Sequence, residues 1–232
     1  MPVPLRFHWS PPGDPGAGAL IDLCSRAEAA GVESVEVNAP ELALLAASQT
    51  ATLRFRVPYH AAVKTTARAA GAGRLAIRMK IEHTDVAQAG RDLDRCRDRF
   101  SESEIHVEGD SAEAAWLTIL HADCLFRSAG RPDQAYADAL PVLHLGKEVG
   151  LKASVIARRT RGEAIHAADL PEAPDVLAGS FEEVAAMLLA YRQRGISHFL
   201  IRGRAGHDDL TAFGSGVLPL LRELERGSAA SA

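Results

Sequence analysis

The sequence predicts one parallel (β/α)8 barrel, an α/β fold also called a TIM barrel. Short apolar segments alternate strictly with helical segments along the whole chain, and such alternation implies parallel strand pairing. There are eight strand and helix pairs, the number that closes a barrel, and the 232 residues lie near the lower end of the size range of this fold. No linker rich in Pro, Gly or Ser divides the chain, so we expect one barrel over residues 1–226 and a disordered tail over residues 227–232.

The eight predicted strands are short apolar segments bounded by polar residues or glycine. In chain order they cover residues 5–9, 34–37, 53–57, 75–81, 104–107, 124–127, 153–157 and 197–201. The eight predicted helices carry apolar residues at helical spacing. They cover residues 19–30, 40–51, 61–70, 85–100, 112–122, 132–149, 181–194 and 210–226.

The last pair has the clearest boundary signals. Ser180 is followed three residues later by Glu183, a spacing typical of a capping box at a helix start. Gly195 can adopt the left-handed conformation that ends many helices. We therefore expect the helix to begin beside Ser180 and to end at Gly195.

Composition argues against several classes of protein. A net charge of −4 and a pI near 6.1 give no basic surface for nucleic acid. No segment approaches the ~20 apolar residues of a membrane span or has the pattern of a signal peptide, so we expect a cytoplasmic protein. The cysteines are three in number and lack CxxC spacing, which favours reduced thiols.

Working residues of this fold lie at the carboxyl ends of the strands and in the loops that follow. The polar residues expected there are His8, Ser10, Asn38, Tyr59, His60, Glu82, His83, Glu108, Asp110, Arg127, Arg158, Arg159, Arg202 and Arg204. We expect these side chains to line the mouth of the barrel.

The segment Gly109-Asp110-Ser111 joins a strand to a helix start. Backbone N–H groups at such a turn can bind a phosphate, and the Ser111 hydroxyl adds a donor. The alternative is purely structural, because Asp110 and Glu113 have the spacing of a capping box, as do Asn38 and Glu41. Asp110 would also repel an anion.

A set of imidazoles and carboxylates suggests a metal site, since neighbouring strands can bring such ligands to one ion. Its members are His8, His60, Glu82, His83 and Glu108. No HxH, HxxxH or HExxH spacing supports this site, so we expect no metal. No GxSxG motif indicates a serine nucleophile either.

Three C-terminal segments together resemble one family. They are Leu177-Ala-Gly-Ser-Phe-Glu-Glu-Val184, the stretch from Tyr191 to Gly203, and Val217-Leu-Pro-Leu-Leu221. They are similar to the C-terminal end of bacterial luciferase-like flavin monooxygenases, most closely the alkanesulfonate monooxygenase branch. Earlier segments agree in order: Phe7 to Ser10 with Gly13-Asp14, Ile21 to Val37, Glu41 to Val57, and Glu108 to Ala115 with His121-Ala-Asp123.

The resemblance implies a (β/α)8 enzyme that uses reduced FMN supplied by a separate flavin reductase and that forms homo-oligomers. Gly109, Asp110 and Ser111 would bind the FMN phosphate. The implied catalytic residues are His8, His60 and Arg204. The residues implied to bind a small anionic substrate are Arg202, Arg204, Tyr59 and His83.

The chain also departs from this branch. Lys152 and Ser154 stand where the branch has an Arg and a His that face the flavin, and Arg204 falls where it has a catalytic Tyr. A long insertion between the later strands is missing. Two alternatives therefore remain open. One is a non-catalytic companion or binding subunit. The other is a metal-dependent sugar isomerase or epimerase, because the segment Gly31 to Glu36 also resembles the second strand of such enzymes.

Overall fold

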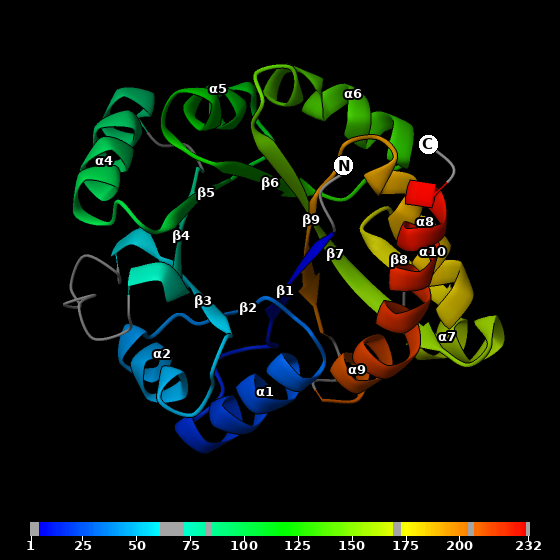
Figure 1. Cartoon of the computed structure of the whole chain (residues 1–232). Helices are drawn as coiled ribbons and strands as arrows, with labels where there is room; N and C mark the ends of the chain where they lie inside the picture. Colours follow the sequence, from blue (N-terminus) through cyan, green and yellow to red (C-terminus); the bar gives the residue numbers. More distant parts are fainter. Residues whose placement is uncertain (1–4, 61–71, 82–84, 169–172, 204–206, 231–232) are drawn as a thin grey trace.

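The computed structural model describes residues 5–60, 72–81, 85–168, 173–203 and 207–230. It confirms the (β/α)8 barrel: parallel strands close into a ring, and helices surround them (Figure 1). The predicted helix over residues 61–70 lies outside the described residues. Within the described part, no helix is long and apolar enough to cross a membrane.

Eight strands form the closed barrel, because β9 pairs with β1 and β7 pairs with β6. In ring order they are β1 (Arg6–Ser10), β2 (Ser34–Glu36), β3 (Arg54–Pro58), β4 (Leu75–Lys80), β5 (Glu104–Glu108), β6 (Cys124–Ser128), β7 (Glu148–Arg158) and β9 (His198–Arg202). A further strand, β8 (Val176–Ser180), pairs with the second half of β7.

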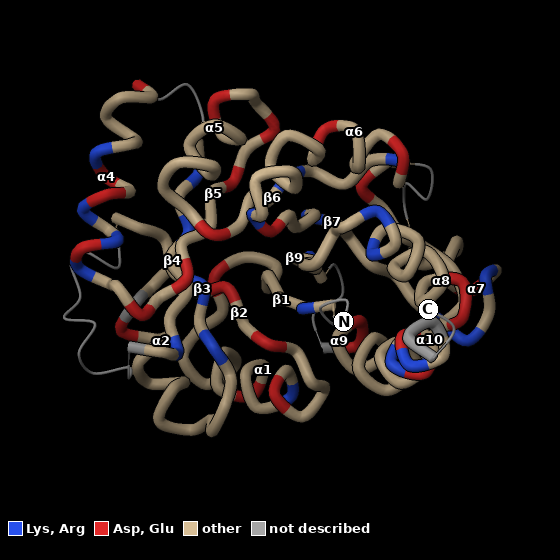
Figure 2. The backbone as a smooth tube through the Cα atoms, turned by 45° about the horizontal axis from the view of Figure 1, so that its top comes forward, with Lys and Arg blue, Asp and Glu red and all other residues tan. Residues whose placement is uncertain are grey.

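Helices cover the outside of the ring. They are α1 (Ala17–Ala29), α2 (Pro40–Ala47), the short 3-10 helix η2 (Ala72–Arg74), α4 (Val86–Arg99), α5 (Ala112–His121), α6 (Pro132–Leu143), α7 (Arg161–Ala167), α8 (Phe181–Arg192), α9 (His207–Ala212), the π-helix η3 (Phe213–Val217) and α10 (Leu218–Ala230). Acidic and basic residues are interspersed over these helices (Figure 2).

The region around β7 differs from the sequence prediction. The helix predicted to reach residue 149 ends at Leu143, a turn with Gly146 at φ 72° follows, and β7 already begins at Glu148. Neither α7 nor β8 is predicted from the sequence. The signal for α7 was available, because Thr160 and Glu163 form a capping box.

The boundary predictions for α8 are confirmed. The Ser180 hydroxyl accepts the Glu183 N–H at 3.2 Å, and the Glu183 carboxylate accepts the Ser180 N–H at 2.9 Å. Gly195 has φ 88°. The single helix predicted over residues 210–226 is instead interrupted by η3, where Gly214 and Gly216 let the backbone approach Ala30 and Phe181.

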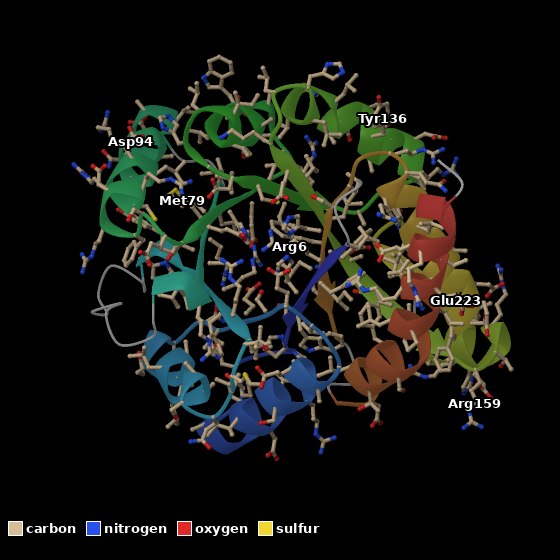
Figure 3. All side chains as sticks on the ribbon, in the orientation of Figure 1. Arg6, Met79, Asp94, Tyr136, Arg159 and Glu223 are labelled. Atoms are coloured by element: carbon tan, nitrogen blue, oxygen red, sulfur yellow. The ribbon has the colours of Figure 1, made fainter. Side chains whose placement is uncertain are left out.

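Alternate residues of each strand face opposite sides of the barrel wall. In β1, Phe7 and Trp9 belong to the apolar core between strands and helices. Arg6 instead pairs with Glu104 of β5 and Glu148 of β7 across the ring, and the His8 ring packs against His106 of β5 and Phe126 of β6. Arg6 accordingly lies at the centre of the barrel in Figure 3. The barrel interior is therefore largely polar, and the apolar core forms a layer around it.

Candidate functional site

The amino ends of the strands enclose a layer of ion pairs. Arg6 Nε donates to Glu33 at 2.7 Å, and Arg6 Nη2 donates to Glu104 at 2.8 Å. Arg54 also pairs with Glu104, at 2.9 Å. Buried charges are stable only when they are paired in this way. This layer closes the end of the barrel opposite the mouth.

Arg56 lies above this layer and is completely buried. Its guanidinium donates to Glu108 at 2.7 Å and to Glu36 at 3.1 Å, and its Nε donates to His106 Nδ1 at 3.1 Å. The same guanidinium lies 4.4 Å from the centre of the Phe126 ring. Burial alone would raise the pKa of Glu108, but the charge of Arg56 is the chief influence that holds it below its ordinary value. Arg56 thus favours the ionised form of the Glu108 carboxylate just below the mouth.

A hydrogen-bonded chain runs through the same level of the barrel. It joins Ser34 to His8 at 2.7 Å, His8 to His198 at 2.8 Å, and His198 to Glu148 at 2.9 Å. Glu148 accepts a hydrogen bond from the Nε2–H of His198, so between neutral imidazoles His8 Nε2–H donates to His198 Nδ1, and the Ser34 hydroxyl donates to His8 Nδ1. Burial and the neighbouring imidazoles hold the pKa of His8 well below its ordinary value. Both ring nitrogens of His8 are therefore occupied by protein partners.

His8 consequently lies deeper than expected. Strand β1 continues to Ser10, and the His8 side chain is only 1% exposed. The barrel mouth begins two residues later. The catalytic role implied for His8 stays a prediction.

The mouth itself carries a second polar network. Asn38 Nδ2 donates to Asp14 at 2.7 Å, and Arg78 donates to Asn38 Oδ1 at 2.6 Å. Arg78 also pairs with Glu36 at 3.0 Å, and so the mouth is connected to Arg56 below. Asn38 does not cap α2, whose first residue follows Ala39, so the capping box expected for Asn38 and Glu41 is wrong.

Two cavities open at the mouth and share Asp14 and Asn38. The first, about 290 Å³, lies beside the ends of β1 and β2 and includes Ser10 and Glu36. The second, about 440 Å³, lies over the ends of β3 and β4. Its lining consists of Asp14, Asn38, Pro58, Tyr59, His60, Arg78, Met79 and Lys80. Tyr59 and His60, both candidates from the sequence, therefore do line a cavity.

The turn Gly109-Asp110-Ser111 follows β5, one strand away from the larger cavity, because Lys80, which lines that cavity, is the register partner of Glu108. Ser111 caps α5 by accepting the Ala114 N–H at 3.2 Å, so the capping box expected to begin at Asp110 is wrong. The Asp110 carboxylate accepts the N–H and the hydroxyl of Ser128, at 2.7 and 2.8 Å. Asp110 therefore fixes the turn to the end of β6.

Two charges near this turn decide what it can bind. Lys152, at the mouth end of the β7 segment that pairs with β6, exerts an attractive charge on both Asp110 and Glu108. Among the described residues it has no hydrogen-bond or ion-pair partner. The exposed Glu113 carboxylate accepts its own N–H and the Ser111 hydroxyl, and these bonds lower its pKa. The donors of the turn thus already hold an anionic group.

The remaining sequence candidates are more dispersed. Arg202 pairs with Asp175, Arg158 pairs with the buried Asp209 at 2.8 Å, and Arg127 donates to the Asp110 carbonyl oxygen at 2.8 Å. Arg159 lies at the periphery (Figure 3). Glu82, His83 and Arg204 lie outside the described residues. In the described part of the chain, no three His, Cys, Asp or Glu residues are grouped to hold a metal.

Sequence reasoning missed Glu36, Arg56, Arg78, Lys80, His106 and His198. Each lies on a predicted strand or next to one, at alternating polar positions. That alternation is the signal that could have identified them.

No protein-family model and no curated protein matches the sequence. Several solved structures, however, superpose on the structure of this chain. A long-chain alkane monooxygenase superposes with a TM-score of 0.78 at 13% identity, over 97% of this chain and 92% of that chain. The coenzyme F420 dependent tetrahydromethanopterin reductase of Methanopyrus kandleri gives 0.73 at 10% identity, over 94% and 99%.

A riboflavin lyase, solved with modified FMN and riboflavin, gives a TM-score of 0.75 at 11% identity, over 96% and 92% of the two chains. The fold is that of the luciferase-like monooxygenases. The resemblance seen in the sequence is therefore confirmed at the level of the fold. The alkanesulfonate branch stays a prediction.

Proposed function

We propose that this chain is an oxidoreductase that binds a flavin-type cofactor, FMN, at the carboxyl end of the barrel. The observation that carries the proposal is the turn at Ser111, where helix donors and the charge of Lys152 are brought together one strand away from the larger cavity. In this fold the carboxyl ends of the strands are where catalysis takes place. Several structural relatives are described as flavin or F420 enzymes, which supports the same class.

The residues at the turn fit the phosphate of FMN. Ser111 and the first N–H groups of α5 are suitable donors, and the ammonium group of Lys152 offsets the charge of Asp110. Glu113 occupies two of these donors, but its side chain is exposed and can turn away. Gly109 is required for the geometry, because a Cβ there would lie 2.8 Å from Ala114.

A bound flavin would supply the electrons for oxygenation or hydride transfer. The chain's own residues would bind and orient the substrate. In this proposal Arg78 and Lys80 attract a small anionic substrate to the larger cavity, and Tyr59 and His60 line it. Arg202 lines neither of these two cavities, whereas Arg78 lines the larger one, so Arg78 replaces Arg202 as the principal anion-binding residue. Roles for His83 and Arg204 stay predictions, as do the separate reductase and the cytoplasmic location.

The test is a titration of the purified protein with FMN and with F420, each oxidised and reduced. We expect binding of FMN with a dissociation constant well below 1 mM. Ser111→Ala should weaken it about 5- to 100-fold, since a charge-assisted hydrogen bond contributes about 1 to 3 kcal/mol. Ser180→Ala is the matched control, because it removes the same kind of helix cap from α8 and should leave the affinity unchanged.

One observation favours the second candidate, a non-catalytic binding subunit. Two carboxylates, Asp110 and Glu113, lie at the turn that would hold the phosphate. If neither cofactor binds below about 1 mM, which corresponds to roughly −4 kcal/mol, the flavin proposal fails. The binding-subunit hypothesis then takes its place.

A further inference from the structure

The two cavities at the barrel mouth differ in the charges that line them. The smaller is lined by the carboxylates of Asp14 and Glu36 together with Ser10, and its lining in the described part of the chain includes no Lys, Arg or His. The larger contains Arg78, Lys80 and His60. The two cavities adjoin each other, because Asp14 and Asn38 line both. Carboxylates therefore predominate in one cavity, and basic side chains predominate in its neighbour.

Asn38 maintains this separation of charge. Its NH2 group donates to Asp14 at 2.7 Å, whereas its carbonyl oxygen accepts from Arg78 at 2.6 Å. The amide therefore lies between the carboxylate and the guanidinium. Its orientation is fixed by both bonds, because reversing the amide would put its NH2 group against a donor.

The walls between the charged groups are suited to a short hydrocarbon chain. Leu20, Val37 and Leu42 line the smaller cavity, and Pro58 and Met79 line the larger cavity. An anion without a second polar group would place apolar atoms against Asp14, and the exposed carboxylate of Asp14 would then lose hydration without a new partner.

We propose that these adjoining cavities bind a zwitterionic small molecule, with its ammonium group at Asp14 and its carboxylate or sulfonate at Arg78 and Lys80. That this molecule is the substrate rests on the proposed function, but its binding does not require the cofactor. A charge contact at a partly exposed site adds modestly to affinity, so a ligand that makes both contacts should bind more tightly than a ligand that makes only one.

The test is calorimetric titration of the flavin-free protein with glycine, 4-aminobutanoate and 6-aminohexanoate, and with hexanoate and hexylamine as ligands of one charge. We expect at least one amino acid to bind about tenfold more tightly than both single-charge ligands. Equal affinities throughout, or no binding of any amino acid below about 10 mM, would overturn the proposal.

Two variants test which residue binds the ammonium group of the ligand and which binds its carboxylate. With Asp14→Asn, the amino acids should bind no more tightly than hexanoate, and the affinity for hexanoate should be unchanged. With Lys80→Gln, the amino acids should bind no more tightly than hexylamine. Asp98→Asn, an equivalent change at an exposed position of α4, should have no effect. If Asp98→Asn lowers affinity as much as Asp14→Asn, the assignment is wrong. A negative FMN titration together with selective zwitterion binding would reject the flavin proposal and retain this site.

Discussion

At the scale of single residues, Glu113 sets the affinity of the proposed phosphate site. Its carboxylate accepts the Ser111 hydroxyl and its own N–H, so a phosphate must displace it. We predict that Glu113→Ala tightens FMN binding about 5- to 10-fold, because the competing anion is removed. Flavin fluorescence titration at low ionic strength measures the change. Glu182→Ala, at the same position of α8, where the carboxylate also accepts the cap hydroxyl, serves as control. Weaker FMN binding by Glu113→Ala would show that no anion binds there.

A second residue-scale prediction concerns acid stability. His106 is buried, and burial followed by the charge of Arg56 lowers its pKa to about 4, although its hydrogen bond to Glu104 acts in the opposite direction. In the unfolded chain the His106 imidazole takes up a proton near pH 6.5, whereas in the folded chain it does so only near pH 4. Stability is therefore lost as the pH falls from about 6.5 towards 4.

We expect His106 alone to remove about 2 kcal/mol of unfolding free energy between pH 7 and pH 5, by the linkage relation. Urea unfolding of wild type and His106→Gln at both pH values measures this. The variant should be less stable at pH 7 but should lose less on acidification, because glutamine takes up no proton. His166→Gln, an exposed histidine of α7, should behave as wild type. An unchanged acid dependence in His106→Gln would contradict the prediction.

At the scale of elements, β7 requires a glycine at position 150. Gly150 faces Phe126 and His198, and a Cβ at this position would lie 2.6 Å from the Phe126 ring and 2.9 Å from His198 Cβ. We predict that Gly150→Ala destabilises the protein by about 1 to 3 kcal/mol through overpacking. Chemical denaturation measures the loss. Gly162→Ala in α7 meets no atom within 4 Å and should be neutral or stabilising. Equal stabilities for the two variants would refute the argument.

The end of α8 gives another prediction. Gly195 has φ 88°, and a Cβ there would lie 3.1 Å from Leu143. We predict that Gly195→Val lowers the melting temperature, with a cost of about 1 to 3 kcal/mol, because a β-branched residue is strained in the left-handed region. Gly195→Asn should cost less, since asparagine tolerates this conformation. No loss of melting temperature in the valine variant would contradict this boundary.

Element order was largely predictable from the sequence, because periodicity and capping signals are local. Strand β8 was not, since Val176-Leu-Ala-Gly-Ser180 is short, contains glycine and is stabilised by pairing with β7. The start of β7 was also missed. Its first residues continue an apolar pattern from α6, and only the turn at Gly146 separates the two elements.

The site was less predictable, for a physical reason. Polar residues alternate with apolar ones in Arg6-Phe-His-Trp9, but this pattern does not say how deep each lies in the barrel. His8 was therefore expected at the mouth, although its partners His198 and Ser34 bury it. The Ser111 turn was found because its signal is local. Arg56 was not, because its partners lie up to 52 positions away.

At the scale of the whole molecule, self-association stays a prediction. The sequence places it on the early helices, and Leu45 of α2 is 43% exposed. Another apolar pair, Trp116 and Leu120, lies four residues apart on α5 and is more than half exposed. We expect sedimentation to show a dimer or larger assembly at tens of micromolar. Leu45→Glu should shift it to monomer, and Trp116→Glu should not. If Trp116→Glu gives a monomer and Leu45→Glu does not, the interface lies on α5 instead. If the wild-type protein is a monomer, the prediction of self-association is wrong.

The polar interior also has a consequence for the order in which the chain folds. Arg6 reaches Glu148 across 142 positions, His8 reaches His198 across 190, and the Leu5 N–H reaches Glu225 across 220. A nascent chain that has completed only its first six strands lacks all three of these partners. Buried cations and imidazoles are costly without them, and distant contacts form slowly. Synthesis of the final strand and helix should thus precede stable closure, which leaves the unfinished barrel dependent on protection while it is being made.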